Sequence, residues 1–148
     1  MKEYEIKRSI PKEKQYEAIL FGYNFFSFTM KFDSFNTYLK GETDWKKSFY
    51  LVDEEDVIVG VYLIGDHNLL IKNPKYNNLK GVEGLLLAVD EDLRGFGFGN
   101  RLKDMPKTLG VDYIWGQQFK ALGNLEDWLK RRELVFETSD VYITAEIF

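Results

Sequence analysis

The chain has 148 residues, no cysteine and a formal net charge of −4 at pH 7. This length suits one domain, and a content of 45% hydrophobic and 16% aromatic residues indicates a folded chain. The lack of cysteine excludes disulfides, thiolate metal sites and a cysteine nucleophile, and the negative charge argues against charge-driven binding to nucleic acid or membranes. With no apolar run of membrane-spanning length and no signal peptide, we expect a cytoplasmic protein.

The first third of the sequence predicts one strand followed by two helices. Residues 4–8 alternate in polarity, as in a strand with one buried face. Pro11 suits the first turn of a helix. The apolar face of that helix is predicted to consist of Tyr16, Ile19, Leu20 and Tyr23. A second, short helix is predicted with Asp33 or Ser34 as its cap, Phe35, Tyr38 and Leu39 inward, and Gly41 just past its end.

The middle of the chain predicts a hairpin, a central strand and a glycine-rich turn. Residues 49–52 and 57–64 pair around an acidic turn at 53–56. Residues 84–89 are apolar on both faces, which indicates a strand in the centre of a sheet. After the glycine-rich segment 94–99, a helix is expected to run to about Leu109, kinked or shortened by Pro106.

The last third predicts a strand, a helix and a closing strand pair. The strand covers 111–115, and the pair covers 135–136 and 141–147. The helix is expected to face the core through Leu125, Trp128 and Leu129, with Asn124 as its cap, and the last strand to turn Val141, Ile143, Ala145 and Ile147 inward. No linker or repeat divides the chain, so we expect a single domain over 1–148.

The turn Arg94-Gly95-Phe96-Gly97-Phe98-Gly99 carries the strongest functional signal. Alternate glycines let several backbone N–H groups point to one place, and the next helix adds unpaired N–H groups, so the turn suits a phosphate. A dinucleotide fingerprint would need glycine at Asn100, and a P-loop would need Lys-Ser/Thr where Asn100 and Arg101 stand. The spacing therefore argues against a nucleotide-binding α/β domain.

The pattern Val89-x-x-x-x-Arg94-Gly95-x-Gly97-x-Gly99 resembles the acetyl-CoA signature of the GNAT N-acetyltransferase superfamily, and the predicted element order is similar to that family's throughout. The resemblance implies an α+β fold with α/β/α layers. Its mixed, mostly antiparallel sheet has about seven strands and four helices, and it splays between the fourth and fifth strands. It also implies acetyl-CoA as cosubstrate and direct acetyl transfer, in a ternary complex, to a primary amine of a small molecule or peptide.

Carried onto this sequence, the resemblance places the pantetheine arm of acetyl-CoA along Leu87 and Val89 and the pyrophosphate on the turn amides. Arg94 would help to fix the loop, while Phe96 and Phe98 would pack or shield the cofactor. Asn124 would either contact the cofactor or cap its helix. The expected cofactor-binding residues are Leu87, Val89, Arg94, Gly95, Phe96, Gly97, Phe98, Gly99, Asn100 and Asn124.

Glu83 is the candidate general base, since some family members have a glutamate at this position. A period of two places Glu83 on the strand face of Leu85, Leu87 and Val89, where an apolar setting would raise the pKa of its carboxyl group. The alternative is a solvated residue at the exposed start of the strand.

The sequence departs from the family at the helix that often carries a tyrosine acid, because Leu129 occupies the matching position. Water, Tyr113 or Tyr142 remain as proton donors for the departing thiolate. His67 lies in a turn by composition and is assigned no role, and no cluster has the spacing of metal ligands.

The acceptor side is expected near the aromatic segment 22–29, which shows no helical face. Phe25, Phe26 and Phe28 either form an apolar wall of the acceptor pocket or only pack in the core. The expected partners are acetyl-CoA and a small amine or peptide, with the chain a monomer or homodimer. The alternative function is a catalytically silent GNAT-fold module that binds an acyl-CoA or a protein.

Overall fold

A seven-stranded sheet in the order β1-β2-β3-β4-β5-β7-β6 forms the centre of the computed structural model, which describes residues 3–148. Its strands are β1 (Tyr4–Arg8), β2 (Phe49–Asp53), β3 (Ile58–Gly65), β4 (Gly81–Val89), β5 (Tyr113–Phe119), β6 (Glu133–Glu137) and β7 (Val141–Ile147). The helices are α1 (Lys12–Phe26), α2 (Phe32–Glu42), α3 (Phe98–Asp104) and α4 (Leu125–Leu129). The predicted count of strands and helices is confirmed.

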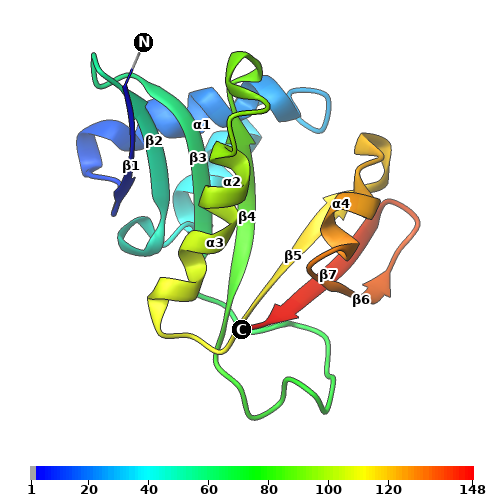
Figure 1. Cartoon of the computed structure of the whole chain (residues 1–148). Helices are drawn as coiled ribbons and strands as arrows, with labels where there is room; N and C mark the ends of the chain where they lie inside the picture. The colour runs from blue at the N-terminus through cyan, green and yellow to red at the C-terminus, as the bar shows by residue number, and fades with distance from the viewer. Residues whose placement is uncertain (1–2) are drawn as a thin grey trace.

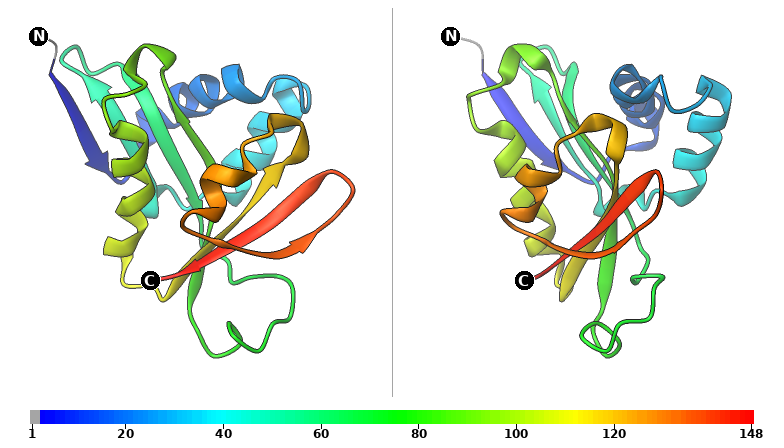
Figure 2. Two further views of the ribbon diagram at one scale, coloured as in Figure 1. Left: turned by 45° about the vertical axis from the view of Figure 1, so that its right-hand side comes forward. Right: turned by 90° about the vertical axis from the view of Figure 1, so that its right-hand side faces the viewer.

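The helices cover the sheet in two layers. Helices α1 and α2 lie on one face, and α3 and α4 lie on the other (Figure 2). Each face has its own core: Ile19, Leu39 and Leu86 belong to the cluster beneath α1 and α2, whereas Leu51 and Leu102 belong to the cluster beneath α3. No helix among residues 3–148 is long and apolar enough to cross a membrane.

The first helix differs from its predicted limits and face. It continues to Phe26, through a segment expected to be non-helical, and it buries Ala18, Ile19 and Gly22. Tyr16 and Leu20, predicted on the inner face, are exposed instead. Gly22 allows the close approach, because a Cβ atom there would lie 2.9 Å from the side chain of Leu86. The inner face of α1 is thus determined by small residues that pack against β4. A prediction based on large apolar residues does not identify this face.

The second helix begins without the predicted cap. Neither Asp33 nor Ser34 caps it: Lys31 is the N-cap residue, and no side chain bonds the free N–H groups. Gly41, expected beyond the end, lies within the last turn. Phe35 and Leu39 are buried as predicted, whereas Tyr38, also predicted to face inward, is exposed.

Strands β4 and β5 pair in parallel over only four positions and then separate. The register runs from Gly81 opposite Tyr113 to Gly84 opposite Gly116. Beyond this point β4 continues to Val89 and β5 to Phe119 without pairing with each other, and the two strands diverge in Figure 1. The predicted splay between the fourth and fifth strands is confirmed. A Cβ atom on Gly116 would lie 3.0 Å from the carbonyl oxygen of Gly84, so the last pair needs glycine.

A β-bulge in β4 overturns the predicted orientation of Glu83. Leu63 of β3 pairs with Leu86, but the next residue, Ile64, pairs with Gly84, so Leu85 is an extra residue in the ladder. The bulge reverses the alternation of faces. Glu83 therefore shares the α1/α2 face with Leu86 rather than the opposite face with Leu87, as strict period two predicted.

The C-terminal elements match their predictions in type more closely than in detail. Pro106 ends α3 early, as predicted, and a 3₁₀-helix at Met105–Leu109 follows it. Helix α4 buries none of its residues, so its expected core-facing side is wrong, and Asn124 makes no side-chain cap. In β7, Ile143 and Ala145 are buried as predicted, whereas Ile147 is exposed.

Gly116→Ala tests the close contact at the end of the parallel pair. The added methyl group meets a backbone oxygen, so the free energy of unfolding should fall by about 1–3 kcal/mol. Gly41→Ala is the matched control, since a Cβ atom there meets nothing within 4 Å, and it should stabilise the helix by up to about 1 kcal/mol. Urea denaturation measures both, and equal stabilities for the two variants would contradict the contact.

Candidate active site

The glycine turn forms a backbone surface that no side chain covers. Gly95 and Gly97 adopt left-handed φ angles of 87° and 83°, and Gly97 is the N-cap of α3. A Cβ atom at Gly95, Gly97 or Gly99 would meet nothing within 4 Å, so the space in front of the turn is open. Buried Leu93 anchors the turn to the core beneath α3. A bound group can therefore approach these amides closely.

A groove of 670 Å³ runs from this turn along the end of β4 that no longer pairs with β5. Nine of the ten predicted cofactor residues line it: Leu87, Val89, Arg94, Gly95, Gly97, Phe98, Gly99, Asn100 and Asn124. Phe96 does not line the groove and is 71% exposed. Phe98 also packs edge-on against Tyr4, with ring centroids 5.3 Å apart. The structure thus brings together the predicted set with one exception.

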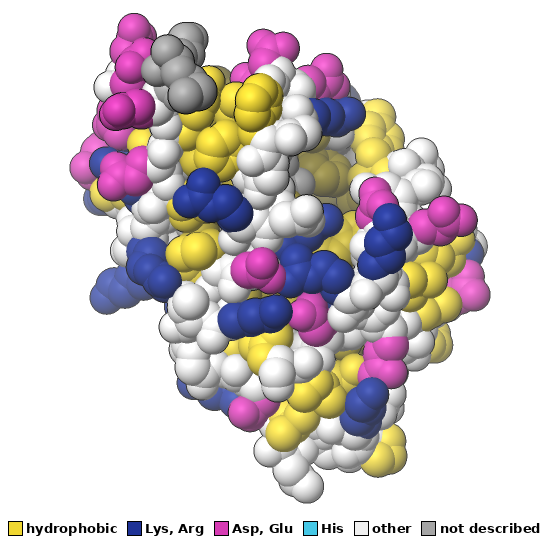
Figure 3. Space-filling model, in the orientation of Figure 1, with side chains coloured by type: hydrophobic (Ala, Val, Ile, Leu, Met, Phe, Trp, Pro, Cys, Tyr) yellow, Lys and Arg dark blue, Asp and Glu magenta, His cyan; other side chains and the backbone are white. Residues whose placement is uncertain are grey.

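Lys103 adds a positive charge to this groove that the sequence reasoning missed. It lies on α3, its ammonium is 4.9 Å from the ring centroid of Trp128, and burial lowers the pKa of the amine. Arg94, by contrast, is exposed and lies 3.8 Å from Glu91. Figure 3 shows this face hollowed between α3 and α4, with hydrophobic side chains inside and Lys or Arg side chains beside the hollow. A lysine one turn after a glycine-rich turn was a signal available in the sequence.

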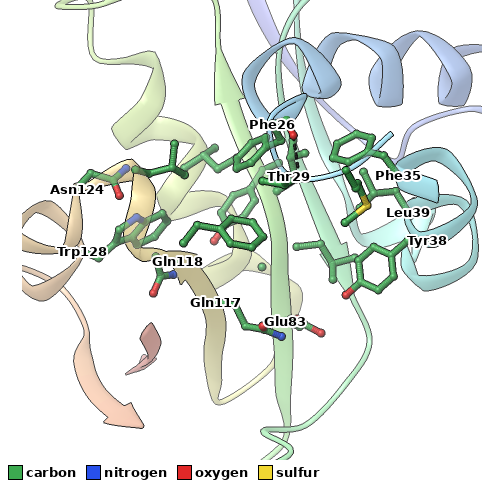
Figure 4. A pocket seen from close by; sticks show the side chains of 18 residues that line it. Phe26, Thr29, Phe35, Tyr38, Leu39, Glu83, Gln117, Gln118, Asn124 and Trp128 are labelled. Atoms are coloured by element: carbon green, nitrogen blue, oxygen red, sulfur yellow. Dashed lines mark hydrogen bonds between the residues drawn. The ribbon is translucent and has the colours of Figure 1, made fainter. Parts of the chain in front are cut away.

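A second, mostly apolar cavity of 310 Å³ opens between the separated strands (Figure 4). It is lined from α2 by Phe35, Tyr38 and Leu39, from β4 by residues 83–87, and from the end of β5 by residues 117–119. Trp128 of α4 closes another side. Phe26, Leu87, Leu122 and Asn124 line both the cavity and the groove. The two spaces therefore meet where β4 and β5 part.

Glu83 lines this cavity and is only 6% exposed. Burial raises the pKa of its carboxyl group to about 7, because a charge there has lost most of its water. The charge of Glu42 raises the pKa further, while His67 lowers it. The alternative of a solvated Glu83 at an exposed strand end does not fit this burial.

His67 lies beside this carboxylate cluster rather than in an isolated turn. Its Nε2 atom is 3.0 Å from Oε2 of Glu42 on α2. Gly65, which pairs with Glu83 across β3 and β4, would place a Cβ atom 2.9 Å from the imidazole. The ring therefore occupies the side-chain space next to Glu83, because opposite residues in an antiparallel pair share a face.

The three phenylalanines proposed for the acceptor wall separate in space. Phe26 lines both the cavity and the groove, whereas Phe25 lines the groove alone. Phe28 lies outside both spaces and is 57% exposed. The tyrosines considered as acids, Tyr113 and Tyr142, line neither space. The hydroxyl of Tyr113 instead accepts a hydrogen bond from the N–H of Leu69.

Comparison with known proteins rests on structure alone, since no family model and no curated protein sequence matches this chain. Three solved structures illustrate the similarity. An acetyltransferase of the GNAT family from Staphylococcus aureus Mu50 has a TM-score of 0.68 and 14% identity, covering 98% of this chain and 99% of that one. Ard1 from Thermoplasma volcanium has a TM-score of 0.69 and 16% identity, covering 97% of each chain. Naa50 from Arabidopsis thaliana has a TM-score of 0.71 and 13% identity, covering 98% of this chain and 99% of that one.

The chain has the GNAT fold. The similarity extends over essentially the whole of each chain, so every element of the sheet takes part. The resemblance inferred from the glycine motif is thereby confirmed at the level of the GNAT fold. Within residues 3–148 no group of three or more His, Asp or Glu side chains is arranged to hold a metal ion.

The raised pKa of Glu83 predicts a specific dependence of stability on pH. The folded state holds the proton more tightly than the unfolded state, so the stabilisation is complete below pH 4.5 and is lost as the pH rises through about 7. The side chain of the Glu83→Gln variant stays neutral at every pH. The free energy of unfolding of the variant should therefore rise relative to that of the wild type by about 3 kcal/mol from acid to alkaline pH.

Chemical denaturation at pH 4.5 and at pH 8.5 measures this change. Glu5→Gln is the control, because Glu5 is exposed on β1 and its substitution should have the same small effect at both values. If the two variants show the same change in unfolding free energy between the two pH values, the carboxyl group of Glu83 is solvated and is not a buried base.

Proposed function

We propose that this protein is an acetyl-CoA-dependent N-acetyltransferase that acts on a primary amine. One observation carries the proposal: the groove before the glycine turn and the cavity that contains Glu83 meet where β4 and β5 separate. A donor lying in the groove can therefore present a reacting group to an acceptor in the cavity. Direct attack within a ternary complex needs this arrangement.

The groove suits acetyl-CoA through its backbone and its charge. The open amides around Gly95 and Gly97 fit a pyrophosphate, and Lys103 supplies a nearby cation. The unpaired edge of β4 at Leu87 and Val89 offers amide and carbonyl groups to the pantetheine arm. Among proteins of the same fold, Naa50 from Arabidopsis thaliana is in complex with the bisubstrate analogue CoA-Ac-MVNAL, and PaiA from Thermoplasma acidophilum is in complex with coenzyme A.

The cavity suits an amine attached to an apolar body. Its walls include Phe26, Phe35 and Leu39, and its polar groups include Glu83 and the amides of Gln117 and Gln118. An apolar side chain of a peptide or a small organic amine would bury its surface there, with the amine directed to Glu83. Phe26 is the one phenylalanine of the three expected that supports the acceptor-wall assignment.

Glu83 is proposed to accept the proton that the amine loses during attack. Its pKa of about 7 lets it be ionised at neutral pH while still binding a proton effectively. Glu83 pairs with Trp115 of β5, next to the last β4–β5 pair, so its backbone is held by the sheet. The carboxylate can then return the proton to water through the open side of the cavity.

Gly97→Ala tests the cofactor assignment. A methyl group facing the groove should weaken CoA binding by about tenfold or more, because it blocks close approach to the amides. Gly110→Ala is a matched control: Gly110 has a φ of 74° and open space around it, yet it lies outside the groove. Both variants carry the same backbone strain. Calorimetry with CoA should therefore separate them, and equal affinities would exclude the turn from the site.

A thiol-release assay with acetyl-CoA and a panel of amines tests the activity. Peptides with an apolar first residue and arylalkylamines should be acetylated faster than polyamines, because the cavity walls are apolar. Glu83→Gln should reduce turnover by about a hundredfold and leave CoA affinity unchanged. Binding of CoA without release of thiol from any amine would instead identify the chain as a silent acyl-CoA-binding module.

A further inference from the structure

Acetyl transfer breaks the C–S bond of acetyl-CoA, and the departing sulfur takes up a proton. The position where similar proteins often carry a tyrosine is Leu129, which is exposed and contacts neither space. Water is one donor; a side chain in this role has to come from another element and lie near the point where the groove meets the cavity.

Tyr62 of β3 meets this requirement. It lines the cavity and pairs in register with Leu87, which also lines the groove. Its hydroxyl occupies space that the missing side chain of Gly84 leaves free, since a Cβ atom there would lie 2.6 Å from Oη. The phenol thus lies at the last β4–β5 pair, where the strands begin to separate.

Arg132 lies directly behind this hydroxyl. Its Nη2 atom donates a hydrogen bond to Oη of Tyr62 at 2.8 Å, and its guanidinium lies 4.3 Å from the ring centroid of Trp128. A Cβ atom on Gly116 would lie 3.4 Å from Nη1, so the second glycine of the last pair makes room for the guanidinium. Two glycines that face each other thereby allow a tyrosine and an arginine to meet.

The charge of Arg132 has no counterion in the described part of the chain. The residue is 6% exposed, and it forms no ion pair with a carboxylate within residues 3–148, whereas its neighbour Arg131 pairs with Asp104 and Glu146. Burying an unpaired cation is costly, so an anion that forms during the reaction would be stabilised here.

We propose that Tyr62 donates the proton to the departing sulfur and that Arg132 positions Tyr62 and stabilises its phenolate. This inference rests on the proposed acetyl transfer. The guanidinium donates to the phenol oxygen, which leaves the phenol's own O–H free to donate into the cavity. After the C–N bond has formed, the C–S bond breaks and the sulfur takes this proton. Tyr62 then regains a proton from water.

The two proton-transfer groups lie on opposite faces of β4. Glu83 belongs to the face beneath α2, where the apolar cavity walls lie, and Tyr62 belongs to the face beneath α3. Both residues line the cavity, and they reach it from opposite faces of the sheet.

The test combines binding with turnover. Wild type should bind CoA more tightly than desulfo-CoA at alkaline pH, because the Tyr62 hydroxyl and the Arg132 charge stabilise the thiolate. Tyr62→Phe should lose most of that preference, keep its affinity for desulfo-CoA, and reduce kcat by about a hundredfold with little change in acceptor KM. Tyr50→Phe is the control, since Tyr50 is a buried tyrosine of β2 that lines neither space.

Two further variants keep the test decisive if Tyr62→Phe is unstable. 3-Fluorotyrosine at position 62 preserves the packing and makes the phenol a stronger acid, so the alkaline limb of the kcat profile should move to lower pH. Arg132→Lys should retain part of the thiolate preference, while Arg132→Gln should lose it.

The outcomes separate this inference from the proposed function. If wild type transfers acetyl but Tyr62→Phe keeps the thiolate preference and a kcat within about threefold of wild type, Tyr62 is not the acid. An unmoved alkaline limb with 3-fluorotyrosine leads to the same conclusion. If wild type neither binds CoA nor transfers acetyl, the proposed function fails with it.

Discussion

The backbone contact between Gly84 and Gly116 is the constraint on which the site depends. Parallel pairing of β4 and β5 ends at this contact. Beyond it β4 still pairs with β3 and β5 with β7, but the edges that β4 and β5 turn toward each other have no strand partner. An unpaired strand edge inside a protein leaves N–H and C=O groups without hydrogen bonds, which is costly unless a ligand or water supplies them. These free edges lie where the groove and the cavity meet, so a bound ligand or water can form the missing hydrogen bonds there. The absence of two side chains therefore creates both the opening and the space for the groups around it.

The electrostatics of the site follow from the same geometry. Glu83 and Arg132 are both largely buried, and neither forms an ion pair with the other. Each group is therefore less stable in its charged form than it would be in water. For Glu83 the result is a raised pKa, whereas a guanidinium cannot give up its proton and holds an uncompensated charge instead. Such groups reduce the stability of the empty protein and favour the binding or formation of the opposite charge.

Much of the fold could be predicted from local signals, and the site only in part. The glycine turn, the hairpin and the proline break depend on residues close in sequence, and the structure agrees with each. The residues that line the groove were predictable because one contiguous motif holds most of them. Tyr62 and Arg132, however, are 70 positions apart and meet only through tertiary packing. The inner face of α1 was missed because Gly22 packs closely against Leu86, a contact that apolar periodicity does not reveal.

The bulge at Leu85 separates the orientation of Glu83 from the count of residues in β4. Residues 85–87 are three consecutive leucines, so deletion of any one of them yields the same shortened sequence. That sequence would align with its parent almost perfectly and would keep every named site residue. Regular pairing would then keep Gly84 opposite Ile64 and Glu83 opposite Gly65, so Glu83 would stay on the face beneath α2 without a bulge. The face on which a strand carboxylate lies thus depends on its pairing partner in the neighbouring strand, and the count of residues to the glycine turn does not determine it.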